Sequence, residues 1–317
     1  MKNKQMKVLF YGAGVIGSLY AARLQESGQD VSILARGERL ADIREHGIVL
    51  DDGATGQRTT TRVNAVERLA PEDAYDLVAV TMPRNKVPAV LPVLAANQQT
   101  PNVLFMNQNI VGPDEMINAL GRERVLLGFP GAGGMREGHV VRYIVTSRRE
   151  QATTIGELDG RTTRRLKQMA DALEGAGFPA EICPNMDAWL KTHTAEILPT
   201  AGAFYMTGCD RHRLARTREG MVLMLRGIRE GYKVLRELGV PITPSNHKIF
   251  NWLPEPILLF IMRRMLVGEM TELKVGHANA ARDEMKQIAD EFRALARKTS
   301  VPTPAMERLY PYIDQAV

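Results

Sequence analysis

The chain has 317 residues, 44% of them hydrophobic, which is enough to bury a full core and predicts two globular domains. Its 41 Lys and Arg residues exceed its 36 Asp and Glu residues, but charges of both signs are spread along the sequence. This spread argues against a nucleic-acid partner, because nucleic-acid-binding proteins usually carry a clustered basic stripe. The two cysteines, Cys183 and Cys209, and the six histidines lack the spacing of a metal site, so we expect no bound metal.

The sequence predicts a protein that is neither exported nor inserted into a membrane. Its N-terminal segment passes within a few residues from a basic start into a glycine-bearing strand and turn, without the cleavage site of a signal peptide. The most apolar later segment, Ile257–Met262, has six residues before Arg263, whereas a helix needs roughly 20 to cross a bilayer. We therefore expect a soluble, cytoplasmic protein without a membrane partner.

Strands and helices are predicted to alternate in the first half of the chain, as is typical of a parallel sheet. The expected strands are 7–11, 30–35, 75–80 and 102–106, and the expected helices are 15–24, 86–96 and 113–120. Three ribbon-like segments, at 47–50, 58–63 and 139–146, could extend the same sheet. A helix at 161–176 and a short strand at 179–182 complete this half.

Strand signals stop near Cys183-Pro184-Asn185, and helical patterns take over. The expected helices are 189–206, 213–238 and 278–298, with shorter ones at 256–266 and 304–312. Four prolines in the middle of this half, at 241, 244, 254 and 256, mark places where helices must end or kink. We therefore predict two domains, residues 1–183 and residues 184–317, of which the second is entirely helical.

The sequence GAGVIG is a GxGxxG motif that directly follows the first expected strand and opens the first expected helix. Gly12 would allow the tight turn, Gly14 would let the backbone approach a pyrophosphate, and Gly17 would allow close packing of the helix on the strand. The helix N-terminus would offer N–H groups and a partial positive charge to the phosphates. We expect a dinucleotide at the six motif residues, Gly12, Ala13, Gly14, Val15, Ile16 and Gly17.

The end of the second expected strand indicates which dinucleotide binds. An NAD-dependent enzyme usually has an Asp or Glu there, which binds the ribose 2′-hydroxyl. This chain has Ala35-Arg36-Gly37 instead, and a guanidinium can bind a 2′-phosphate. Arg36 therefore indicates NADP, with Arg39 sharing the contact; the alternative is a solvated loop arginine. The first half is predicted to be a Rossmann-type α/β domain with a doubly wound sheet.

Several motifs together make the chain resemble the ketopantoate reductase family over nearly its whole length. Besides the glycine motif they are Ile33–Leu40 (ILARGERL), Asn109–Gly112, Ile155–Gly160 (IGELDG), Trp189-Leu190-Lys191 and Thr271-Glu272. They occur in the order and rough spacing of that family. The resemblance implies an NADPH-dependent reductase of a 2-oxo acid or related ketone, in the manner of 2-dehydropantoate 2-reductase. It assigns NADP binding to residues 1–183 and catalysis to residues 184–317.

The resemblance also assigns roles to single residues. Lys191 and Glu272 match the catalytic pair, Asn109 would contact cofactor and substrate, and Arg84 would lie in a cofactor loop. A lysine ammonium beside a ketone can stabilise the negative charge that hydride transfer builds on the oxygen, and it can donate a proton. By residue type alone, Lys191 and Glu272 would be solvated charges and Asn109 a turn former.

The chain departs from the family at three positions that the family turns toward its substrate. Ala195 and Pro199 replace asparagines, and Phe260 replaces a serine. With Ala195 and Phe260 as substrate-binding positions, the substrate could be larger and more apolar. Two alternatives therefore stay open, a reductase of such a different ketone or oxo acid and a catalytically inactive NADP-binding sensor. The expected partners are NADPH and a small molecule, and a homodimer stays open.

Overall fold

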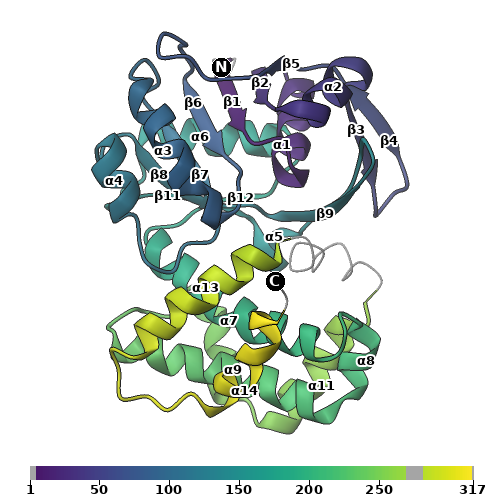
Figure 1. Ribbon diagram of the computed structural model, residues 1–317, viewed down its shortest axis with the longest axis vertical. Helices are drawn as coiled ribbons and strands as arrows, with labels where there is room; N and C mark the ends of the chain where they lie inside the picture. The colour runs from purple at the N-terminus through teal and green to yellow at the C-terminus, as the bar shows by residue number, and fades with distance from the viewer. Residues whose placement is uncertain (1–4, 269–280, 316–317) are drawn as a thin grey trace. The chain divides into compact units, whose positions relative to one another are not determined.

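The computed structural model describes residues 5–268 and 281–315 (Figure 1). Its internal contacts divide the chain into two units. Met1–Asn107 and Pro113–Met186 form the first, here called the N-terminal unit, and Gln108–Gly112 and Asp187–Val317 form the second, here called the helical unit. The chain therefore enters the helical unit for five residues before it finally leaves the N-terminal unit after Met186.

The main sheet of the N-terminal unit has eight strands in the order β12-β11-β8-β7-β6-β1-β2-β5. All neighbouring strands are parallel except β11 and β8. The strands are β1 Lys7–Tyr11, β2 Asp30–Leu34, β5 Asn64–Val66, β6 Leu77–Val80, β7 Val103–Met106, β8 Val125–Phe129, β11 Thr153–Glu157 and β12 Ala180–Ile182. The chain runs from β1 to β2 on one side and places β6 on the other side of β1, so the order reverses beside β1. The predicted Rossmann-type, doubly wound fold is confirmed.

A second sheet of four strands, β4-β3-β10-β9, lies beside the main one. Its strands are β3 Ile48–Asp52, β4 Arg58–Thr61, β9 Ala132–Glu137 and β10 Val140–Val145. The suggestion that these segments extend the main sheet is therefore wrong. The physical reason lies in β10, where Val141 and Tyr143 are buried and Arg142 between them is exposed, so one face needs a cover.

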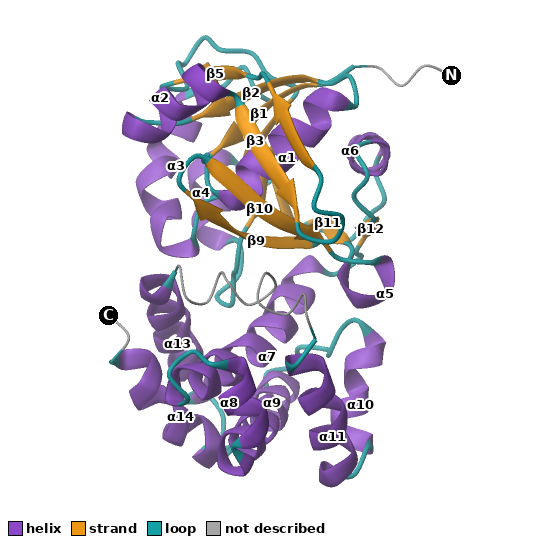
Figure 2. Ribbon diagram, turned by 90° about the vertical axis from the view of Figure 1, so that its right-hand side faces the viewer, coloured by secondary structure: helices purple, strands orange, loops and turns teal. Residues whose placement is uncertain are grey.

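Helix α1, Val15–Glu26, provides that cover because it packs between the two sheets (Figure 2). Tyr20 at its centre stacks on Phe178 with ring centroids 4.0 Å apart. The Tyr20 hydroxyl lies 2.6 Å from Thr153 Oγ1 and accepts the N–H of Gly131 at 3.1 Å. Tyr20 thus fixes one face of the helix, while the strands of both sheets contact it, and the position of its N-terminus is fixed with it.

Two pairs of helices in the N-terminal unit are in contact. Helix α6 contacts α1, and α3 contacts α4. Their bounds are α2 Gly37–His46, α3 Val87–Ala96, α4 Asp114–Leu120, α5 Arg148–Gln151 and α6 Arg164–Gly175, with a 3-10 turn η1 at Arg84–Lys86. Helix α6 is held against β11 by Glu157, which accepts hydrogen bonds from Arg165 and Thr163.

In the described part of the helical unit every element after Asp187 is a helix or a turn. The elements are α7 Met186–Met206, α8 Arg211–Arg216, α9 Arg218–Glu237, η2 Ser245–Lys248, α10 Ile249–Trp252, α11 Glu255–Leu266, α13 Arg282–Ala296 and α14 Pro304–Asp314. The predicted helix 213–238 is divided into α8 and α9 at Thr217, whose backbone is extended. The hydroxyl of Thr217 donates a hydrogen bond to the carbonyl of Arg213 in the last turn of α8. An all-helical second half is confirmed for these residues.

Helices α7 and α9 cross at a contact between small side chains. A Cβ added at Gly227 would lie 2.6 Å from Cβ of Pro199, and one added at Gly231 would lie 3.0 Å from Cβ of Ala195. The two contacts are four residues apart on both helices, so the two helices face each other along one stripe of small residues. Ala195 and Pro199 therefore let the two backbones approach closely.

Neither a membrane span nor a metal cluster is found in the described ranges. No helix there is both long and apolar enough to cross a bilayer. No group of three or more His, Cys, Asp or Glu residues there has the geometry to hold a metal ion.

The stability that is lost on replacing Glu157 should depend on pH in a defined way. Burial raises the pKa of Glu157, but hydrogen bonds from Arg165 and Thr163 outweigh it and leave the pKa below its usual range. The carboxylate therefore stabilises the fold above the unfolded pKa of roughly 4.3, and this contribution is lost as pH falls toward the folded pKa. We expect Glu157→Gln to lower the unfolding free energy by about 1.5–3 kcal/mol at pH 7 and by less near pH 3. Urea denaturation at both pH values measures this, and an equal loss at both would contradict it.

Candidate functional site

The turn between β1 and α1 is shaped by two glycines that have steric reasons to be glycine. Gly12 has a φ of +120°, which side chains rarely adopt, and its carbonyl accepts the hydroxyl of Thr81 at 3.0 Å. A Cβ added at Gly17 would lie 1.9 Å from the carbonyl oxygen of Gly12. Thr81 follows β6, so the turn lies where the strand order reverses. Ligands of open α/β sheets bind at this edge.

Gly14 differs from the other two glycines because the protein itself gives no reason for it. Its φ is −73°, and a Cβ added there would meet nothing within 4 Å. It is the N-cap of α1, and the open space in front of it is where the pyrophosphate of a dinucleotide would approach the backbone. The turn therefore fits a dinucleotide by the criterion that the motif predicts.

Arg39 stabilises the turn between β1 and α1 by hydrogen bonds. It is buried, and its guanidinium donates to the carbonyl of Ala13 at 3.2 Å and to Ser18 Oγ at 2.9 Å. A further nitrogen donates to the carbonyl of His139 at 3.2 Å, in the connection between β9 and β10. Arg39 therefore uses its donors on the protein, and sequence reasoning, which gave it a share in phosphate binding, did not foresee this role.

The two other predicted cofactor arginines have opposite environments. Arg36 is exposed at the N-cap of α2. Arg84 is buried at the start of η1 and forms an ion pair with Glu115 of α4, Nη2 to Oε2 at 3.1 Å. Arg36 is thus accessible to a ligand, whereas Arg84 is engaged inside the unit.

A second set of predicted residues meets in the helical unit. Lys191 of α7 donates from Nζ to Asp187 Oδ2 at 2.5 Å, one helical turn earlier, and the Lys191 side chain is 16% exposed. A Cβ added at Gly112 would lie 3.5 Å from the other oxygen of Asp187. The loop Gln108–Gly112 and the first turns of α7 therefore adjoin, which brings Asn109 and Lys191 into one region.

Asn109 shapes that loop. Its amide nitrogen donates to the carbonyl of Gly112 at 2.9 Å, and its Oδ1 accepts the N–H of Gly112 at 3.0 Å. Gly112 has a φ of +95°, which explains the glycine. Gln108 at the start of the loop accepts the hydroxyl of Thr194 at 3.2 Å, which ties the loop to α7. Asn109 thus acts as a turn former, the reading that residue type alone favoured.

Asp187 was missed by sequence reasoning. A carboxylate four residues before a lysine on one helix is a common stabilising pair, and this spacing could have identified it. By accepting a hydrogen bond, Asp187 limits the direction in which the Lys191 ammonium points.

The predicted substrate positions lie in different surroundings. Ala195 is fully buried against Gly231 and Pro199 packs on Gly227, so both face helix α9 rather than a surface. An asparagine at Ala195 would overpack this contact, which corrects the expectation that polar contacts are simply missing there. Phe260 on α11 is 63% exposed. Glu272 lies outside the described residues.

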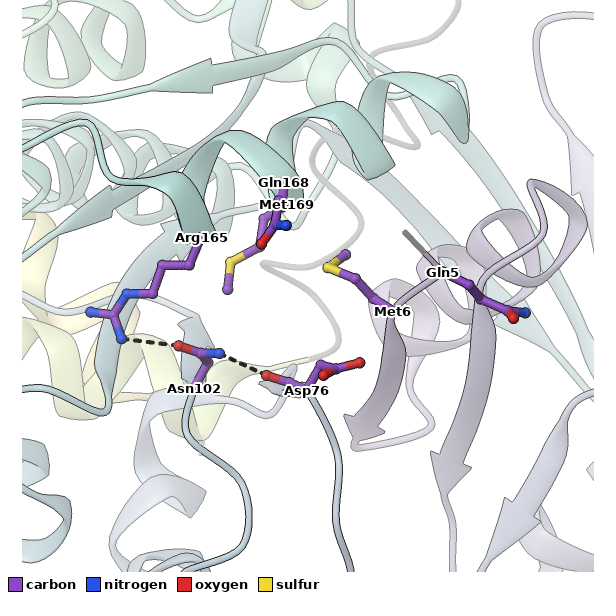
Figure 3. A pocket seen from close by; sticks show the side chains of 7 residues that line it. All are labelled: Gln5, Met6, Asp76, Asn102, Arg165, Gln168 and Met169. Carbon is purple, nitrogen blue, oxygen red and sulfur yellow. Dashed lines mark hydrogen bonds between the residues drawn. The ribbon is translucent and has the colours of Figure 1, made fainter. Parts of the chain in front are cut away.

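A pocket in the N-terminal unit is lined by residues that include Asp76, Asn102 and Arg165 (Figure 3). Asp76 precedes β6 and Asn102 precedes β7, so the pocket is at the amino ends of the strands, whereas Gly12 follows β1 at the carboxyl ends. Arg165 donates to Asn102 Oδ1 at 3.0 Å, and Asn102 donates to the carbonyl of Asp76 at 2.8 Å. These bonds close the end of the sheet, and we assign the pocket no ligand.

The reversal of strand order and the glycine turn define the Rossmann class of dinucleotide-binding folds. Residues 8–160 match the family described as ketopantoate reductase PanE/ApbA. Over these residues, just under half of the chain, the sequence is similar to the ketopantoate reductase family, and the predicted resemblance is confirmed. Members of this family are NAD(P)-dependent reductases.

Relatives with known names support this assignment. The 2-dehydropantoate 2-reductase of Archaeoglobus fulgidus is 32% identical over 193 residues, which are 58% of this chain and 59% of the relative. The 2-dehydropantoate 2-reductase of Pyrococcus horikoshii is 26% identical over 186 residues, 58% of each chain. The alignments thus span less than two thirds of either relative.

Solved structures resemble the fold over nearly the whole chain. The 2-dehydropantoate 2-reductase from Geobacter metallireducens superposes with a TM-score of 0.75 at 19% identity, covering 98% of this chain and 100% of that one. D-mandelate dehydrogenase with NADH and anilino(oxo)acetate superposes with a TM-score of 0.76 at 16% identity, covering 98% of each chain. At these identities the likeness concerns the fold.

The second and third glycines of the motif, Gly14 and Gly17, should respond differently to replacement by alanine. Gly17→Ala should lower the unfolding free energy by about 2–3 kcal/mol, because its Cβ would meet a backbone oxygen that cannot move away cheaply. Gly14→Ala should cost less than about 1 kcal/mol, the difference between two N-cap residues. Chemical denaturation of both variants without cofactor measures this. Equal losses would show that Gly14 also has a steric role in the fold.

Proposed function

We propose that the protein is an NADPH-dependent reductase of a 2-oxo acid or related ketone, with the chemistry of 2-dehydropantoate 2-reductase. The observation that carries the proposal is the Lys191 ammonium, held by Asp187 beside the loop that Asn109 closes. The open space before Gly14 and the similarity to the ketopantoate reductase family support it. The relatives from Archaeoglobus fulgidus and Pyrococcus horikoshii bear the name of this activity.

Lys191 would act on the carbonyl oxygen of the substrate. When bound, NADPH supplies the hydride that the carbonyl carbon accepts, and negative charge then grows on the oxygen. The Lys191 ammonium stabilises this charge by donating a hydrogen bond and then gives up its proton to form the hydroxyl. Asp187 accepts a second hydrogen of the same ammonium, so it orients Lys191 without contacting the substrate. Glu272 is proposed as a substrate ligand from the family resemblance.

The cofactor-binding residues of the proposal are the glycine turn and Arg36. The N–H groups at the start of α1 would bind the pyrophosphate, with Gly14 as the point of closest approach. Arg36 is exposed one strand further along, where it would bind the 2′-phosphate of NADPH. Arg84 and Asn109 would support this site indirectly, because both side chains are engaged by protein groups.

A second candidate is a reductase of a bulkier, more apolar ketone. Phe260 and its neighbours Ile257 and Ile261 are exposed on one stripe of α11, and Phe260 stands where the family resemblance implies a substrate-binding serine. An apolar substrate group would find a surface there. The fold neighbour D-mandelate dehydrogenase carries anilino(oxo)acetate, an aromatic compound, in its own structure.

Lys191→Met should lower kcat by about 100-fold or more, the usual scale for a positioned acid, and should leave the affinity for NADPH unchanged. The measurement is NADPH consumption, followed by absorbance, against a panel from 2-dehydropantoate to aryl-substituted 2-oxo acids. Lys233→Met is the control because Lys233 is an exposed lysine of α9 in the same unit. Near-normal turnover by Lys191→Met on the best substrate would remove Lys191 from the mechanism. A preference for the aryl acids would favour the second candidate.

NADPH should bind more tightly than NADH, and Arg36→Met should weaken NADPH binding by about tenfold or more, because it removes a bidentate contact to a phosphate. Binding of NADH should hardly change. Arg44→Met is the matched control, since Arg44 is an exposed arginine of the same helix. Fluorescence titration of both cofactors gives the affinities. Equal affinities of the wild-type protein for NADPH and NADH would refute the assignment of NADP.

A further inference from the structure

The second sheet carries an arginine that neither the motifs nor the proposed function uses. Arg136 is an exposed residue of β9. It pairs across the strands with Val141, and Gly134 pairs with Tyr143. Directly opposed residues of an antiparallel pair share a face, so Arg136 lies on the face of the sheet that Val141 and Tyr143 bury against α1.

That face leads to the glycine turn. A Cβ added at Gly134 would lie 3.0 Å from the side chain of Val15, the first residue of α1. Arg136 is two residues further along the same face of β9, toward the connection whose His139 carbonyl accepts a hydrogen bond from Arg39. The strand thus runs from the start of α1 toward the start of α2.

Two further arginines, Arg36 and Arg39, belong to the start of α2. Arg39 lies one turn after Arg36 in α2. Burial lowers the pKa of the Arg39 guanidinium, and the positive charge of Arg136 lowers it further. The carboxylate of Asp42 lies 3.9 Å from Arg39 and partly offsets this repulsion. Across residues 5–268 and 281–315, no ion pair or hydrogen bond of the Arg136 guanidinium occurs.

A cluster of like charges on a surface is unfavourable unless an anion joins it. The guanidinium of Arg39 donates hydrogen bonds to Ala13, Ser18 and His139, whereas the exposed guanidinium groups of Arg36 and Arg136 can donate to a ligand. A phosphate monoester carries about −1.5 to −2 charges at pH 7 and accepts several charge-assisted hydrogen bonds. Its charge is more than Arg36 alone would neutralise.

We propose that Arg136 is a second ligand for the 2′-phosphate of NADP, supplied by the second sheet and acting together with Arg36. The inference rests on the proposed NADP-dependent function. It adds a specificity-determining residue from an element outside the β1-α1-β2 segment that carries the motif.

The chain offers a matched control on the same sheet. Arg142 of β10 is exposed and pairs with Met135, so it lies on the opposite face from Arg136. Replacing either arginine by methionine removes one positive charge from an exposed site of the same sheet. Long-range electrostatic effects should therefore be similar, and only the local contact should differ.

The test is a fluorescence titration of the full-length protein with NADPH and with NADH, for the wild type, Arg136→Met, Arg136→Lys, Arg142→Met and Arg36→Met. We expect Arg136→Met to weaken NADPH binding by about tenfold and to leave NADH binding within about twofold. Arg136→Lys should recover part of the loss, because it keeps the charge without the bidentate geometry. Arg142→Met should behave as the wild type.

The other outcomes separate the two proposals. If Arg36→Met weakens NADPH binding and Arg136→Met does not, this inference is wrong and the proposed function stands. If Arg136→Met weakens both cofactors equally, the residue supports the turn and does not bind the 2′-phosphate, which also overturns the inference. If the wild type binds both cofactors equally, or neither, both proposals fail.

Discussion

The N-terminal unit depends on one close approach, that of the Cα atom of Gly17 to the carbonyl of Gly12. Any side chain at residue 17 would overlap that carbonyl. Because Gly17 has none, helix α1 can start immediately beside the end of β1. The helix then lies between two sheets and contacts both, and the Tyr20 hydroxyl and ring fix one of its faces. A surface helix could adjust its start by a residue or two. A helix enclosed on both faces cannot, so its free N–H groups have a defined position.

Polar side chains support the candidate site by binding backbone groups rather than by facing a ligand. Arg39 satisfies the carbonyls of Ala13 and His139, and Asn109 satisfies both polar groups of Gly112. Such bonds fix the conformation of loops that have no ladder of their own, and their loss would leave buried polar groups unpaired. Residues that hold a loop can therefore be as necessary to a site as residues that contact its ligand.

The local parts of this structure could be predicted from sequence, and the long-range parts could not. The first strand, the glycine turn and α1 depend on contiguous residues, and the prediction for them is confirmed. The second sheet was not foreseen because β3 and β10 pair in parallel although Val49 and Val140, which face each other, are 91 residues apart in the sequence. Arg39 was read as a phosphate ligand because its acceptors lie 26 and 100 residues away. Asp187 was within reach, since it stands one helical turn before Lys191.

The excursion of Gln108–Gly112 into the helical unit means that the two units are joined by three passages of the chain rather than one. A cut after Met186 would separate the bulk of the two units but would leave the five-residue loop without Thr194 and Asp187, its partners in α7. A chimaera that takes only the residues after Met186 from a relative would likewise separate the loop Gln108–Gly112 from its partners in α7. The loop and α7 form one inheritable module, although the sequence holds their ends some 75 residues apart.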